Sequence, residues 1–74
     1  MKTLEQILEK EKAHRREDGP FGINACKEHI KWWSDHFHDP LERLLDEYIE
    51  RANNDAFFNN AMVLACWELI KGVD

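Results

Sequence analysis

Glycine and proline are scarce in this sequence, with three and two residues among 74. Because these residues punctuate turns and loops, we expect short connections and a mostly regular chain. No glycine-rich phosphate loop is present, and no segment alternates apolar and polar residues as a strand does. The sequence therefore predicts an all-α fold, and its length predicts a single helical domain over residues 1–74.

Long hydrophobic segments are missing as well. The longest uninterrupted apolar stretch is AMVLACW, residues 61–67, which is far too short to cross a bilayer. Residues 1–12 contain no continuous apolar run like that of a signal peptide. We therefore expect a cytoplasmic protein with no membrane partner. In that compartment Cys26 and Cys66 stay reduced and act as small hydrophobic residues.

Positive charge is scarce beyond the first quarter of the chain. The net charge is −5, and residues 1–18 contain five basic and five acidic side chains, so the acidic excess lies in residues 19–74. An acidic body disfavours phosphate backbones as partners. Acidic residues also interrupt the basic stretch KEKAHRR, residues 10–16. We expect a solvated helix face there rather than a nucleic-acid contact.

Hydroxyl nucleophiles are nearly absent, since Ser34 is the only serine and Thr3 the only threonine. Cys26 and His29 are a conceivable thiolate pair, but no identifiable residue would orient the histidine. We therefore expect no enzymatic activity and no cofactor.

Local start and stop signals divide the chain into helices. Thr3-Leu4-Glu5-Gln6 has the form of a capping box and predicts a first helix that extends to about Glu17, ended by Asp18-Gly19-Pro20. A second helix is predicted from about residue 22 to residue 38. Asp39-Pro40-Leu41-Glu42 predicts the next start, with Asp39 as N-cap and Pro40 at the first helical position.

The third helix continues with apolar residues at three- and four-residue spacing to about Ala52. Asn53-Asn54-Asp55 predicts a break, and a fourth helix follows from about Ala56 to Lys71, stopped by Gly72. The sequence thus predicts a small four-helix bundle. Three helices, with the last two continuous, is the alternative.

The second helix has a wide apolar surface. On a helical wheel its central stripe consists of Ile23, Cys26, Ile30, Trp33 and Phe37. Trp33 is therefore predicted to lie in the core. Trp32 lies at the far margin beside Glu28, where one neighbouring helix would hardly cover it.

The fourth helix is apolar nearly all the way round, which predicts burial on every side. Three partner helices cannot easily surround such a helix in a small monomer. We therefore expect leftover apolar surface, and exposed tryptophans typically anchor protein interfaces. The predicted contact residues are Trp32, Trp67, Phe57 and Leu64.

Cysteine and histidine leave a metal-binding alternative open. Cys26 and His29 stand three residues apart on one helix face, which is half of a workable zinc site. His36 lies about 10 Å beyond His29 by helix rise, and His38 would join it only if the chain turned there. Neither CxxC nor HxxxH spacing occurs, so edge and corner histidines are the favoured interpretation.

A row of acids on the third helix, Glu42, Asp46 and Glu50, supports a further alternative. Its regular spacing resembles the charge of a nucleic-acid backbone, as in a mimic that inhibits a nucleic-acid-binding protein. A solvated helix face is the simpler interpretation.

Together these observations predict a small acidic protein–protein interaction module. It would be an accessory factor, adaptor or inhibitor of the compact kind common in phages and mobile elements. The tryptophan-containing surface would make the contact, and the acidic row would tune orientation and association rate. A homodimer would bury the same surface.

Overall fold

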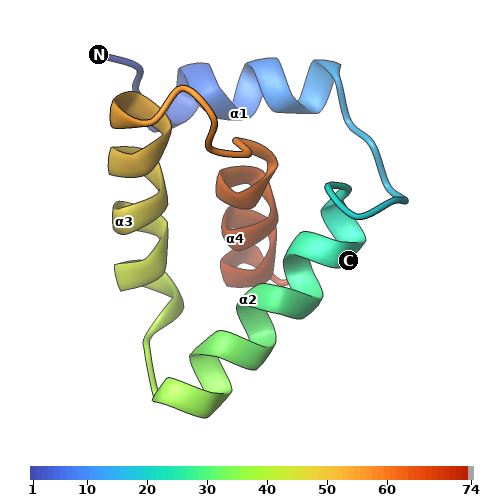
Figure 1. Cartoon of the computed structure of the whole chain (residues 1–74), viewed down its shortest axis with the longest axis vertical. Coiled ribbons are helices and arrows are strands. Elements are labelled where there is room, and N and C mark those ends of the chain that lie inside the picture. Colours follow the sequence, from blue (N-terminus) through green and yellow to red (C-terminus); the bar gives the residue numbers. More distant parts are fainter. Residues whose placement is uncertain (74) are drawn as a thin grey trace.

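The computed structural model describes residues 1–73, and Asp74, the last residue of the predicted domain, lies outside the described part. Its four helices are α1 (Leu4–Ala13), α2 (Ile23–Phe37), α3 (Leu41–Asn54) and α4 (Ala61–Lys71). Figure 1 shows α4 between α2 and α3, with α1 lying across one end. The all-α prediction is confirmed, and α3 and α4 are separate helices.

The first helix begins where the sequence predicts but ends earlier. The Thr3 hydroxyl accepts from the Gln6 N–H, and the Gln6 side chain accepts from the Thr3 N–H, so the capping box is complete. The predicted end near Glu17 is wrong, because α1 stops at Ala13. The carbonyls of Arg16 and Glu17 instead accept from the Ile23 and Asn24 N–H groups, which satisfies the first turn of α2.

The corner between α2 and α3 also differs from the prediction. Pro40, not Asp39, is the N-cap of α3, and no side chain caps that helix. The Asp39 carboxylate instead accepts from the Trp33 indole N–H at 3.3 Å and from Arg43. These partners use the oxygens that a capping box would need, so the predicted cap does not form.

The start of α4 is the largest error in the predicted boundaries. The break after α3 is confirmed, but α4 begins at Ala61 rather than near Ala56. The Asp55 carboxylate accepts from the Phe57 N–H at 2.9 Å, and the Asn59 side-chain oxygen accepts from the Ala61 N–H at 3.2 Å. Such side-chain contacts compete with helix formation. Gly72 ends α4 in the left-handed conformation, as predicted.

The core is built around α4, which packs against each of the other three helices. The buried apolar residues are Ile7, Leu8, Ile23, Cys26, Ile30, Leu44, Tyr48, Ala52, Ala61, Val63, Leu64, Ala65 and Cys66. The most exposed large apolar side chains lie outside α4, whereas Met62, Trp67, Leu69 and Ile70 of α4 are partly buried, so the leftover apolar surface expected on α4 is smaller than predicted. Phe37, predicted in the central stripe, is exposed because it lies at the end of α2.

No helix within residues 1–73 combines the length and the apolar character needed to cross a membrane.

Candidate functional site

An aromatic cluster on α2 is formed by Trp32, His36 and Phe37. The Trp32 side chain is 56% exposed and Phe37 is 52% exposed. The His36 ring stacks on Trp32 with centroids 4.7 Å apart and planes 10° apart, and Phe37 meets Trp32 edge-on at 6.0 Å. Because each ring restrains the next, the cluster is a pre-ordered apolar surface that does not belong to the core.

Hydrogen bonds at the α2–α3 corner hold this cluster in place. His38 adopts a left-handed conformation with φ 52°, and its N–H donates to the Ser34 carbonyl. The Ser34 hydroxyl donates to the Asp39 carbonyl at 2.6 Å. Arg43 and Trp33 donate to the Asp39 carboxylate, and the Arg43 bond chiefly holds the pKa of Asp39 below its usual value. The last turn of α2 is therefore fixed to the start of α3.

A groove of about 450 Å³ lies beside the N-terminal half of α2. Its lining includes Ala25, Cys26 and Met62, together with Phe21 and Phe57, which are 63% and 97% exposed. The Asn59 side chain donates to the Phe21 carbonyl at 3.0 Å and so ties the chain before α2 to the chain before α4. Apolar side chains thus lie near both ends of the outward face of α2.

The predicted contact residues do not form one surface. Trp32 is exposed, as predicted, and Phe57 projects into solvent. Leu64 is fully buried in the core, so its assignment to a contact surface is wrong. Trp67 is half-buried and lies under the Lys12 ammonium, 4.6 Å from the ring centroid. That contact joins α4 to α1, away from the aromatic rings that surround Trp32.

The acidic row on α3 faces solvent. Glu42, Asp46 and Glu50 are all exposed, and none of them pairs with a basic side chain within the described residues. Their row lies opposite the buried row of Leu44, Tyr48 and Ala52. The acidic row therefore points away from the bundle and is separate from the aromatic cluster of α2.

The predicted cysteine–histidine alternative does not assemble. Within residues 1–73, no group of three histidine, cysteine, aspartate or glutamate side chains is placed to hold a metal ion. Cys26 is a free thiol that contacts the Asn59 side chain at 3.6 Å. Burial raises the pKa of Cys26, so its thiolate form is disfavoured. His36 lies against Trp32 instead, while His38 caps the helix.

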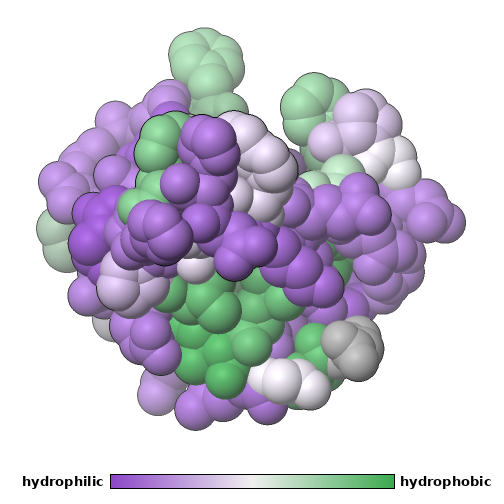
Figure 2. Space-filling view, turned by 90° about the horizontal axis from the view of Figure 1, so that it is seen from below, coloured by the Kyte–Doolittle hydropathy of each residue, from purple (hydrophilic) through white to green (hydrophobic). Residues whose placement is uncertain are grey.

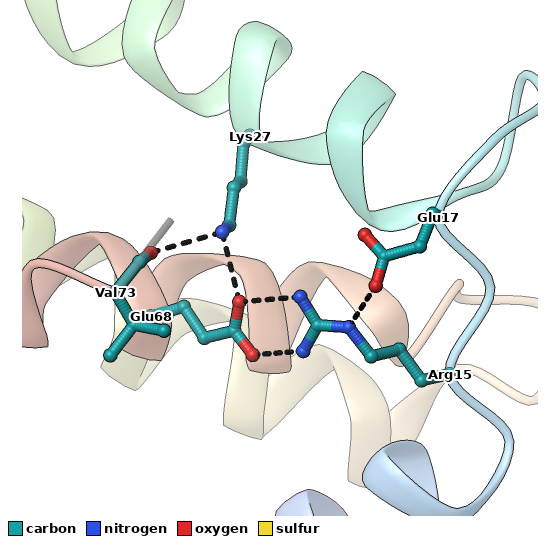
Figure 3. A network of polar contacts seen from close by, with 5 residues as sticks. All are labelled: Arg15, Glu17, Lys27, Glu68 and Val73. Atoms are coloured by element: carbon teal, nitrogen blue, oxygen red, sulfur yellow. Dashed lines mark hydrogen bonds and ion pairs between the residues drawn. The ribbon is translucent and has the colours of Figure 1, made fainter.

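A buried ionic network joins three parts of the chain, as Figure 3 shows. The Glu68 carboxylate on α4 is 3% exposed and accepts from both Arg15 and Lys27, with Lys27 Nζ 2.9 Å from Oε1. Lys27 also donates to the Val73 carbonyl at 3.0 Å. Arg15 chiefly, and Lys27 less, hold the pKa of Glu68 below its usual value.

Sequence reasoning missed this network. The sequence predicts a solvated face for the basic stretch of residues 10–16, which includes Arg15. The available signal was Glu68 itself, a lone acid within an apolar helix, because a buried charge needs partners. Its partners lie far away in sequence, and they make the network a structural connection between α4, α2 and the segment after α1.

Figure 2 shows a hydrophobic area framed by hydrophilic residues on the face that it presents. Half-buried apolar residues packed on the core are Leu4, Trp33, Leu41, Leu45, Ile49, Phe58, Met62, Trp67, Leu69 and Ile70. Each of these side chains has a structural role in covering the core. Trp32 has no such role, and this distinguishes the aromatic cluster as the candidate site.

Comparison with known proteins gives no match, whether with family models, with curated proteins or with solved structures.

Proposed function

We propose that this protein is a protein-binding module that self-associates through the outward face of α2. The observation that carries the proposal is the exposed Trp32, which is 56% exposed and stacked on His36. An exposed tryptophan outside the core contributes little to folding. Tryptophan is also among the residues whose removal most weakens protein interfaces.

The order of the aromatic cluster also supports binding. Trp32 is restrained by His36 and Phe37, and the corner hydrogen bonds fix the end of α2. Association therefore requires little loss of side-chain freedom, which is one of the main costs of forming an interface. Burying the indole would remove apolar surface from water and favour association.

A matched pair of variants tests the proposal. We expect the wild-type chain to form dimers whose population increases with concentration in sedimentation and native mass spectrometry. Trp32→Ala should weaken the dimer by about 2 kcal/mol or more, roughly 30-fold in dissociation constant. Lys31→Ala, the neighbouring exposed position, should leave the dimer unchanged.

Circular dichroism should show the same helix content for both variants and the wild type. A wild-type chain that stays monomeric at millimolar concentration would contradict the proposal. So would a Trp32→Ala variant that dimerises as the wild type does.

A further inference from the structure

The outward face of α2 repeats every seven residues. Ala25 and Trp32 form a central line along this face. Glu28 and Asp35, here called the acid edge, lie on one side of that line. His29 and His36, the histidine edge, lie on the other side, by the helical turn of about 100° per residue. Both edges are exposed along their length.

A seven-residue repeat has a geometric consequence for two helices that meet. Residues seven apart return to nearly the same side of a helix, so two parallel helices stay in register along such a face. When the two-fold axis runs parallel to the helices, each edge of one copy meets the opposite edge of the other copy. In an antiparallel pair, each edge instead meets the same edge of the second copy.

The two edges of α2 are chemically complementary. Glu28 and Asp35 carry acceptor oxygens, and an imidazole offers an N–H donor whether it is neutral or protonated. A parallel pair therefore brings acceptors to donors on both sides of the central line. An antiparallel pair would bring carboxylate against carboxylate, which is unfavourable.

We infer that a second copy of this chain docks on α2 in parallel, with the two Trp32 side chains meeting at the two-fold axis. The acid edge of each copy then lies against the histidine edge of the other. Glu28 would meet His29 of the second copy, and Asp35 would meet His36, each pair offset by one residue. This inference rests on the proposed self-association and specifies its geometry.

The two edge pairs differ in their surroundings. His29 also lines a small hollow with Glu47 and Arg51 of α3, so charged side chains of its own chain lie near its ring. His36 lines a shallow hollow formed only with Trp32 and Asp35. No α3 side chain lines that hollow, and the His36 ring is already held against Trp32, so the pair of Asp35 with His36 should contribute more to docking.

Cysteine cross-linking distinguishes the parallel from the antiparallel arrangement. In a Cys26→Ala background, Ala25→Cys places one thiol of each copy beside the two-fold axis, where a disulfide can form. Asn24→Cys is the matched control, since it is adjacent in sequence but about 100° away around the helix. We expect a covalent dimer from Ala25→Cys under mild oxidation and little from Asn24→Cys.

Mixing two variants tests the pairing of the edges. One variant carries Glu28→Ala and Asp35→Ala, and the other carries His29→Ala and His36→Ala. Each homodimer would lose all four edge pairs, and because even one such pair corresponds to about tenfold in affinity, each variant should dimerise at least tenfold more weakly than the wild type. In the mixture, one intact acid edge meets one intact histidine edge, so heterodimers should exceed their statistical share in native mass spectra.

The outcomes separate the two proposals. A wild-type dimer combined with no Ala25→Cys cross-link, or with a statistical share of heterodimers, overturns the parallel arrangement and leaves self-association intact. Absence of any wild-type dimer overturns both.

Discussion

The helices α4 and α2 use their apolar residues in opposite ways. In α4 every residue except Glu68 and Lys71 is apolar, yet no large apolar side chain on it is exposed. In α2 the apolar residues are gathered on one wide side of the helix, yet Trp32 and Phe37 face solvent. The difference follows from neighbours, because α4 packs on three helices while α2 packs mainly on α4.

This comparison shows that composition alone does not locate a binding surface. A strongly apolar helix at the centre of a bundle buries its large side chains in the core. A less apolar helix with one neighbour keeps an open outward face, and large rings on that face are available for contact. The following variants test this contrast, beginning with the largest expected effect.

Leu64→Ala should remove a large part of the free energy of unfolding. Leu64 is fully buried on α4, and truncating such a side chain leaves a cavity that costs about 3 to 5 kcal/mol. The free energy of unfolding, measured by urea titration, should fall by this amount. Trp32→Ala is the matched control on α2 and should cost less than about 1.5 kcal/mol. Equal losses in the two variants would show that the two helices do not differ as described.

Glu68→Ala should have the next largest effect on stability. Removing this carboxylate leaves Lys27 buried without its partner and releases Arg15, whose side chain is 29% exposed. A buried pair broken in this way costs up to about 3 to 5 kcal/mol, and the partial exposure of Arg15 reduces the expected loss to about 2 to 3 kcal/mol. Thermal and urea unfolding would measure it.

Acid titration provides an independent check on Glu68. Because its pKa in the folded protein is lowered, its contribution is complete above the ordinary glutamate pKa of about 4.3 and is lost as pH falls through the folded-state value. The stability difference between wild type and Glu68→Gln should therefore shrink on acidification below that pH. A difference that stays constant from neutral to strongly acidic pH would contradict the ionic network.

Phe57→Ser should change stability least. Phe57 is 97% exposed and makes no contribution to the buried core, so its loss should stay within about 0.5 kcal/mol. A loss above about 1.5 kcal/mol would mean that this ring is covered in solution, for example by folding into the groove that it lines beside α2.

The features predicted correctly from the sequence are those that depend on near neighbours in the chain. The Thr3 capping box and the Gly72 stop involve residues within one helical turn, so their signals are complete in the sequence. The exposure of Trp32 followed from its position at the margin of one helix wheel. Its function in binding stays a prediction.

Tertiary contacts determine what the sequence signals missed. The pattern at Asp39 predicted an N-cap, but Trp33 and Arg43 bind its carboxylate. The sequence could not show that Leu64 is buried while other apolar residues of α4 are partly exposed, because a helix with apolar residues on every side has no distinct buried face. Arg15 and Lys27 become partners of Glu68 only when α2 and the segment after α1 pack around α4, which the sequence pattern does not reveal.

The central position of α4 also governs the order of folding. The helices α1, α2 and α3 make few contacts with one another, and each packs chiefly on α4. Because α4 follows them in the chain, residues 1–60 have almost no shared surface to bury before α4 is present. We therefore expect these three helices to lack a packed core until the segment from Ala61 to Lys71 joins them. Packing should then follow in a single cooperative step, with α4 as the template for the other three helices.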